Sequence, residues 1–183
     1  MSQRNRVHAV GWTLGALLLR PAWVQAQTCN APIPNGTCST PSTTTTLTVG
    51  TVLQLTLGSS TSPLRVPLWA DYAAGFVADN GPIATVQANR PWKLQISAAA
   101  ATWTAVNTVP GVIARPTKPA ADLRWGLAVG GPFTPLSTTI ADAATGPATA
   151  SATVNLFYRT MYSWALDTPG AYSLTVVFTL IHQ

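Results

Sequence analysis

The sequence contains no glutamate, only two lysines and only two histidines among its 183 residues. Its five acidic residues are all aspartates, and each lies near a turn-forming residue. We therefore expect these aspartates to shape turns rather than to act as paired catalytic carboxylates. The sequence has no aspartate-rich loop of regular spacing, so it does not predict a calcium site. The five are Asp71, Asp79, Asp122, Asp142 and Asp167.

Catalytic and cofactor motifs are equally scarce. Beyond the first 26 residues His182 is the only histidine, next to the C-terminus, and no serine stands in a Gly-x-Ser-x-Gly elbow. The sequence also lacks a Cys/His cluster, a phosphate-binding glycine loop and a dinucleotide-binding pattern. It therefore predicts a protein that is not an enzyme and that uses neither a cofactor nor a metal ion.

Residues 1–26 have the pattern of a secretory signal peptide. Arg4 and Arg6 supply a basic start, residues 9–19 are mostly apolar, and small residues precede a cleavage position before Gln27. The chain is therefore expected to be exported to the periplasm, the cell surface or the medium.

Retention of the N-terminal segment is the alternative, in which residues 7–26 contact the membrane as an anchor. A spanning helix needs about 20 apolar residues, whereas this run is shorter and is interrupted by Arg20. Without residues 1–26, seven basic residues and five aspartates remain, a formal charge of +2. These basic residues are dispersed, so nucleic acid is not an expected partner.

The only two cysteines, Cys29 and Cys38, flank a short segment rich in turn residues. In an oxidising compartment this arrangement predicts a local disulfide, with a stabilising effect on the order of 2 to 3 kcal/mol. Residues 27–45 are interpreted as this disulfide loop followed by a Thr/Ser/Pro-rich linker.

Residues 46–183 fit one domain whose segments alternate apolar and polar residues with a period of two. This pattern, punctuated by Gly and Pro turns, predicts an all-β fold: an antiparallel two-sheet immunoglobulin-like sandwich of about six to eight strands. The clearer strands are expected at 47–57, 83–88, 92–97, 123–129, 152–164 and 170–183, and weaker ones at 64–69 and 134–140.

The segments between these strands are expected to be turns and connections. A turn at 79–82 should open a hairpin whose two strands are joined at 89–91. The remaining expectations are one helical turn at 98–101, a long surface connection at 107–120, a loop at 141–150 and a tight turn at 167–170.

The last fourteen residues carry the one family resemblance. Gly170 opens a strand in which every second residue from Tyr172 to Leu180 is apolar, and the penultimate residue, His182, has a ring side chain. This resembles the C-terminal strand of subunits from chaperone-usher pili and of spore-coat-U-like secreted proteins. The resemblance implies an incomplete sandwich that is completed by a strand from a chaperone and then from the next subunit.

Two departures accompany the resemblance. His182 stands where those families have a tyrosine, and residues 27–45 lack the alternation that a donor strand needs. Residues 47–57 do alternate, so they could donate a strand to another subunit. Alternatively, they form the first strand of a complete sandwich, since connected strands usually pair within one chain.

Aromatic residues are the remaining candidates for binding. Trp69 and Trp103 lie in irregular contexts, where an exposed platform for sugar or protein is one interpretation and a core or loop-packing role is the other. The candidate interaction surface comprises Trp69, Trp103, Tyr158, Tyr162, Trp164, Tyr172, Phe178 and His182.

Three hypotheses for function follow. The first is a structural or adhesive protein that contacts other subunits at the cell envelope through strand edges and exposed aromatics. The second is an accessory subunit, anchored by an uncleaved N-terminal segment, that docks its sandwich onto a membrane complex. The third is a carbohydrate-binding module, which exposure of Trp69 and Trp103 in one shallow groove would favour.

Overall fold

The computed structural model describes residues 44–183. The predicted export segment 1–26, most of the linker 27–45 and the predicted disulfide between Cys29 and Cys38 lie outside the described residues. Residues 44–52 are exposed and form no strand or helix, and the sandwich comprises residues 49–183.

The elements follow one another mainly as strands, with one short α-helix and one 3-10 helix. They are β1 (Leu53–Leu57), α1 (Trp69–Ala74), β2 (Phe76–Ala88), β3 (Trp92–Ala98), β4 (Thr104–Val106), η1 (Ala120–Asp122), β5 (Leu123–Gly126), β6 (Thr134–Pro135), β7 (Ala141–Gly146), β8 (Thr149–Met161), β9 (Ala171–Ser173) and β10 (Val176–His182).

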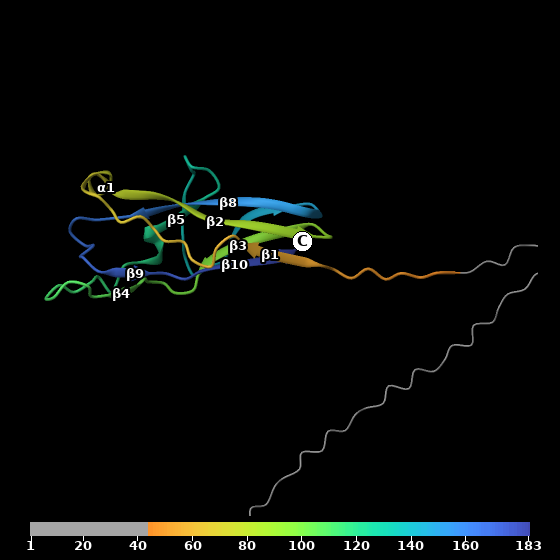
Figure 1. The fold of residues 1–183 in the computed structure, drawn as a ribbon, viewed down its shortest axis with the longest axis horizontal. Coiled ribbons are helices and arrows are strands. Elements are labelled where there is room, and N and C mark those ends of the chain that lie inside the picture. The colour runs from red at the N-terminus through yellow and green to blue at the C-terminus, as the bar shows by residue number, and fades with distance from the viewer. Residues whose placement is uncertain (1–43) are drawn as a thin grey trace, which may run out of the picture. The chain divides into compact units, whose positions relative to one another are not determined.

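The strands form two packed sheets and a separate strand pair. The larger sheet has the order β1-β2-β8-β5-β6, the smaller has the order β10-β3-β7, and β4 pairs with β9. All of these pairs are antiparallel. Figure 1 shows β2 and β8 in one layer and β3 and β10 in the other. The predicted all-β antiparallel sandwich is therefore confirmed, with ten strands in the described residues rather than six to eight.

The core lies between the two sheets and is centred on β3. Alternate residues of β3 are buried, and they face alternate buried residues of β2 and β8. This period of two is the one that the sequence predicts for a strand with one core face. The core side chains of these three strands are Ala84, Val86, Ala88, Trp92, Leu94, Ile96, Ala98, Val154, Leu156 and Tyr158.

The predicted hairpin at 83–97 is wrong, because β2 and β3 belong to different sheets. Residues 89–91 carry the chain across the sandwich, so that the apolar faces of the two strands pack against each other instead of lying side by side. Asn89 fixes this crossing: its Oδ1 accepts a hydrogen bond from the Val52 N–H at 2.8 Å, and its Nδ2 donates to the Gly50 carbonyl at 2.7 Å.

The turn expected at 79–82 is also wrong, since β2 continues through it. Pairing with β8 shifts register between Asn80 and Ile83, so Gly81 and Pro82 are accommodated as an irregularity within one long strand. Pairing on both sides of the irregularity keeps the strand continuous despite its two turn-forming residues.

The weak strand expected at 64–69 is absent, and α1 begins at its end. The Asp71 carboxylate accepts a hydrogen bond from the Leu68 N–H at 2.7 Å, and Gly75 ends the helix with a left-handed φ of 77°. Six residues are too few for a 3.6-residue period to be visible in the sequence.

The boundaries of other strands differ from those expected. Much of the loop predicted at 141–150 is strand: it contains β7 and the start of β8, and the Asp142 side chain accepts hydrogen bonds from Lys93 and Gln95 of β3. The predicted strands 123–129, 134–140 and 152–164 become β5, β6 and β8 with altered ends. The helical turn predicted at 98–101 is absent. The segment 107–120 is a connection up to Ala120, where η1 begins, but it is not a surface connection throughout, because Ala114, Lys118 and Ala120 are buried.

The two terminal strands of the domain are shorter than predicted. Of residues 47–57 only Leu53–Leu57 form a strand, β1, which pairs with β2 of the same chain. The segment 170–183 is divided: β9 pairs with β4, and β10 pairs with β3. Its alternation persists, with the half-buried side chains toward the core.

Candidate functional site: a free strand edge and a buried ion-pair cluster

Strand β10 has a hydrogen-bonded neighbour on one side only. It pairs with β3, and no strand of the described residues pairs with its other edge. Its seven residues, Val-Val-Phe-Thr-Leu-Ile-His, include no proline, no glycine, no lysine and no acidic residue. The edge therefore presents unpaired backbone N–H and C=O groups on an apolar strand, which is a template for pairing with another strand.

The core is incompletely covered along this edge. Val176, Phe178 and Leu180 point to the core side of β10 but are only half-buried, unlike the buried residues of β3. Strand β1, the edge of the larger sheet, contacts β10 and has the same half-buried row in Leu53, Leu55 and Leu57. Two half-buried apolar rows, one on β1 and one on β10, thus lie on the side of the sandwich between these strands.

Two other edge strands have features that discourage pairing. β7 carries Asp142, which forms an ion pair with Lys93 at 2.8 Å, and its register shifts between Leu94 and Gln95 of β3. β6 is only two residues long and contains Pro135. Charges, irregular register, short length and proline are the usual protections of sheet edges, and β10 has none of them.

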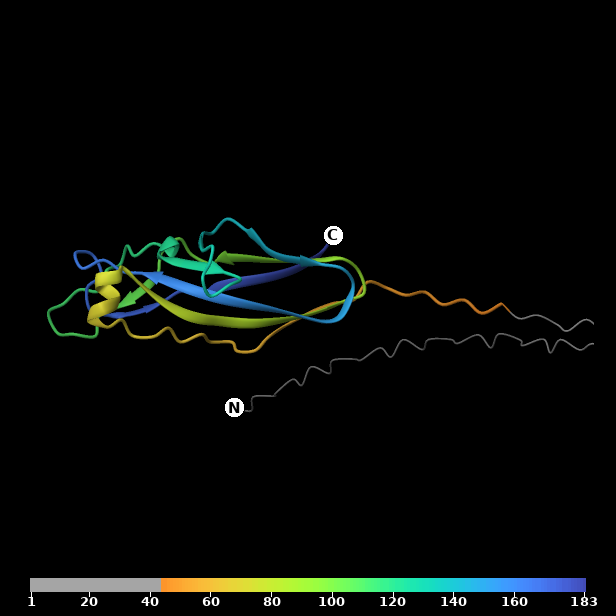
Figure 2. The ribbon, with the colours of Figure 1, turned by 90° about the horizontal axis from the view of Figure 1, so that it is seen from above.

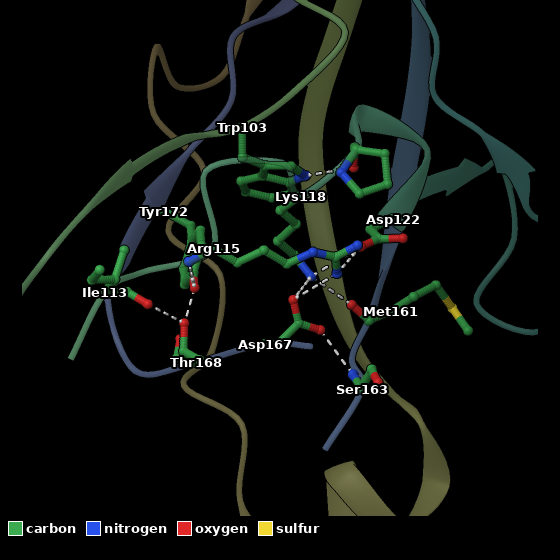
Figure 3. A network of polar contacts seen from close by, with 11 residues as sticks. Trp103, Ile113, Arg115, Lys118, Asp122, Met161, Ser163, Asp167, Thr168 and Tyr172 are labelled. Carbon is green, nitrogen blue, oxygen red and sulfur yellow. Dashed lines mark hydrogen bonds and ion pairs between the residues drawn. The ribbon is translucent and has the colours of Figure 1, made fainter. Parts of the chain in front are cut away.

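A buried ion-pair cluster lies elsewhere in the sandwich, where the 115–122 segment meets the turn after β8 (Figure 3). Lys118 Nζ donates to Asp167 Oδ1 at 2.9 Å, to Asp122 Oδ2 at 3.2 Å and to the Met161 carbonyl at 2.9 Å. The side chains of Lys118 and Asp167 are only 2% and 4% exposed. A buried lysine is tolerated here because its three donors all have acceptors.

Arg115 completes the charge balance of the cluster. Its Nη1 lies 3.1 Å from Asp167 Oδ1 and 3.5 Å from Asp122 Oδ2, so two cations face two carboxylates. Burial raises the pKa of the Asp167 carboxyl, but hydrogen bonds from Lys118, from the Ser163 backbone N–H and from Arg115 outweigh it, so the pKa lies below its usual value.

Hydrogen bonds extend the cluster into the neighbouring loops. The Tyr172 hydroxyl donates to the Thr168 carbonyl at 2.7 Å and accepts from the Arg115 N–H at 2.9 Å. Thr168 Oγ1 in turn donates to the Ile113 carbonyl at 2.7 Å. Tyr162 lies under Lys118, with Nζ 4.9 Å from its ring centre, and burial raises the Tyr162 pKa to about 12. The cluster therefore ties residues 113–122 to residues 161–172.

The sequence prediction placed these aspartates only in turns and missed the cluster. Asp167 does accept a turn hydrogen bond from Ser163 at 2.8 Å, but its other oxygen faces Lys118, which is 49 positions away. The one available sequence feature was the i,i+4 spacing of Lys118 and Asp122, which form an ion pair at 3.2 Å. In a proline-rich connection that spacing does not indicate burial.

The structure separates the eight predicted surface aromatics into three groups. Trp103 and Tyr158 lie in the core, and the Trp103 indole N–H donates to the Pro119 carbonyl at 3.1 Å, so neither belongs to an exposed surface. Tyr162, Tyr172 and Phe178 are half-buried. Trp69, Trp164 and His182 are exposed. Trp69 and Trp103 therefore do not share a groove.

Among residues 44–183, no three histidine, cysteine or acidic side chains gather where they could hold a metal ion. In the same part of the chain, no helix is both long and apolar enough to cross a membrane. No protein-family model matches the chain, and no curated protein matches it.

Replacing Lys118 with methionine is expected to destabilise the fold by about 3 kcal/mol, because Asp122 and Asp167 lose their shared buried cation. The free energy of unfolding in urea measures this change. Lys93→Met is the matched control: it removes the more exposed ion pair with Asp142 and should cost about 1 kcal/mol or less. Equal losses in the two variants would contradict the structural role of the cluster.

The stability of the fold should fall in acid partly through Asp167. Since its pKa is lower in the folded chain than in the unfolded chain, its contribution is present above the unfolded value and is lost as pH falls through the folded value. In Asp167→Asn the slope of unfolding free energy against pH, measured below about pH 5, should be shallower than in the natural chain. An unchanged slope would show that the pKa of Asp167 is not lowered in the folded chain.

Proposed function

We propose that this protein is an exported, non-enzymatic structural protein that joins to other protein subunits at the cell envelope by strand addition along β10. The observation that carries the proposal is the free, uncharged edge of β10 beside a half-buried apolar row. The resemblance of residues 170–183 to pilus-type and spore-coat-U-like C-terminal strands supports the same interpretation.

Strand addition would serve both unsatisfied features of this edge. An extended segment that lies along β10 supplies hydrogen-bond partners for the outward N–H and C=O groups of β10. These main-chain hydrogen bonds give affinity that does not depend on the side chains of the added segment. Alternate apolar side chains of the same segment would cover Phe178 and Leu180 on one side and Leu55 on the other. Each such side chain, once fully buried, contributes about 1.5 to 3 kcal/mol.

The chain itself contains a segment with the right chemistry to be donated. Residues 44–52 are outside any strand, and Leu47, Val49 and Val52 are exposed there. Since β1 starts only at Leu53, no strand of its own chain includes this segment, although Gly50 and Val52 at its end are bonded to Asn89. We propose a second copy of this chain as the donor, with Leu47 and Val49 directed into the β1–β10 side, since residues two apart share one face of a strand.

Edge-blocking substitutions test the proposal. Val177 and Ile181 lie on the exposed face of β10, where lysines add charge without removing core contacts, so Val177→Lys/Ile181→Lys should abolish assembly while the monomer stays folded. The size distribution of the full chain in solution, by light scattering, measures this. The control Ile83→Lys adds a lysine at an exposed position of β2, which is paired on both edges, and should leave assembly intact.

Two results would contradict strand addition at β10. One is a natural chain that stays monomeric at high concentration and that also fails to take up a synthetic peptide of residues 44–52. The other is an assembly that survives the β10 lysines but dissociates in the Ile83→Lys control.

A further inference from the structure

A group of large exposed apolar side chains gathers at the end of the sandwich that carries α1. Three of them lie on or just before α1, and the others lie on the two loops beside it; we call this group the apolar pole. The C-terminus lies at the opposite end in both ribbon views (Figure 1, Figure 2). The members and their exposed fractions are Val66 78%, Leu68 64%, Trp69 76%, Ile113 73%, Trp164 61% and Leu166 55%.

Contacts between the three segments hold the apolar pole together. The Trp164 ring packs on Tyr72 of α1 with ring centres 4.6 Å apart, and the ring centres of Tyr72 and Tyr162 are 5.6 Å apart. The Tyr162 N–H donates to the Gly75 carbonyl at 2.9 Å, which ties β8 to the end of α1. The Thr168 bond to Ile113 connects the third segment.

The ion-pair cluster also holds the loops at this end of the sandwich in place. Arg115 and Asp167 each belong to a loop that also supplies pole residues, and their contact at 3.1 Å joins those loops. The backbone around Ile113 is restrained further, because the Ala114 N–H donates to Asn107 Oδ1 at 2.8 Å. The pole is therefore presented on tied loops rather than on free ones.

The apolar pole offers no free formal charge. Segments 64–75, 105–115 and 162–170 contain four charged side chains in all. Arg65 and Asp71 form a two-contact ion pair with both distances at 2.8 Å, and Arg115 and Asp167 belong to the buried cluster. A partner recognised by charge has no attachment point here.

We infer that the apolar pole binds the interfacial region of a phospholipid bilayer. Exposed aliphatic side chains gain free energy on entering the acyl boundary, and tryptophan prefers the level of the headgroups, where its ring is apolar and its N–H finds an acceptor. A patch of this kind in water is otherwise an aggregation liability.

Sugar and charged macromolecules fit the pole less well. A sugar site needs polar side chains beside its aromatic platform, and here Arg65 and Asp71 satisfy each other while Asn107 is bonded to Ala114. Four of the six pole residues are aliphatic, and their side chains offer no hydrogen-bond acceptor for the hydroxyl groups of a sugar. The absence of free charge also distinguishes this surface from those that bind anionic lipid through lysine and arginine.

This activity is separate from strand addition, because β10 ends at His182 near the C-terminus, away from α1 (Figure 1). A subunit held by its β10 edge would still present the pole. Loss of one activity should leave the other unchanged, which makes the two proposals independently testable.

Flotation of the full chain with vesicles of zwitterionic phosphatidylcholine tests the inference. The natural chain should float with the vesicles equally at low and at high salt. Trp69→Ser/Trp164→Ser should lower the partition coefficient about tenfold or more, since both rings lose their burial. A second variant, Leu68→Asn/Leu166→Asn, keeps both tryptophans and should also weaken binding, so a folding defect in the first variant leaves the test intact.

The control Val129→Asn/Ile140→Asn removes similarly exposed apolar side chains from outside the pole and should change the partition coefficient less than about twofold. The inference is overturned if the natural chain does not float, or if it floats equally well after the pole substitutions, as it would through residues 7–26. It is also overturned if salt releases it, or if the pole substitutions abolish self-association or retention on polysaccharide instead.

Discussion

Strand β3 is the constraint on which the rest of the sandwich depends. It is the central strand of the smaller sheet, its alternate side chains are buried from Trp92 to Ala98, and both β7 and β10 are attached to the fold through it. Its position follows from the crossing at residues 89–91, where Asn89 fixes the turn by bonds to Gly50 and Val52. β3 packs across the core from β2 instead of pairing with it, and within the described residues the smaller sheet has one strand on each side of β3.

The two edge strands of the smaller sheet, β7 and β10, differ in how far they are protected from further pairing. On the β7 side, an ion pair and a register shift protect the edge. On the β10 side, backbone groups and a half-buried apolar row stay open. At the end of the sandwich that carries α1, buried ion pairs tie the loops together in addition to the β4–β9 strand pair. The ion pairs of Lys118, Arg115 and Lys93 thus form within the fold, whereas the candidate contact surface along β10 carries no charge. Such a surface suits association through backbone hydrogen bonds and burial of apolar side chains.

The sequence was informative wherever one strand buries one face. The alternation of residues 92–97 and 170–183 predicted strands with the right core faces, and the all-β sandwich followed from it. The pairing of strands was harder to predict, because alternation does not say whether two successive strands pair in one sheet or pack across the core. The hairpin predicted at 83–97 was wrong for this reason. Local turn chemistry at Asp79 to Pro82 was overridden by pairing with β8. The cluster of Lys118 and Asp167 joins residues far apart in sequence, so only the folded chain reveals it. The free edge of β10 also depends on strand order, although its uncharged sequence was visible from the start.

Amide hydrogen exchange along β10 tests strand addition at this edge most directly, because each antiparallel edge strand has N–H groups that point away from its partner. In the monomer, the outward N–H groups of residues 176–182 should exchange within the time expected for exposed amides, while those bonded to β3 are protected. On assembly, the outward groups of β10 should become protected and those of β7 should not. Assembly that leaves exchange along β10 unchanged, or protection of the outward groups already in the monomer, would contradict strand addition at this edge.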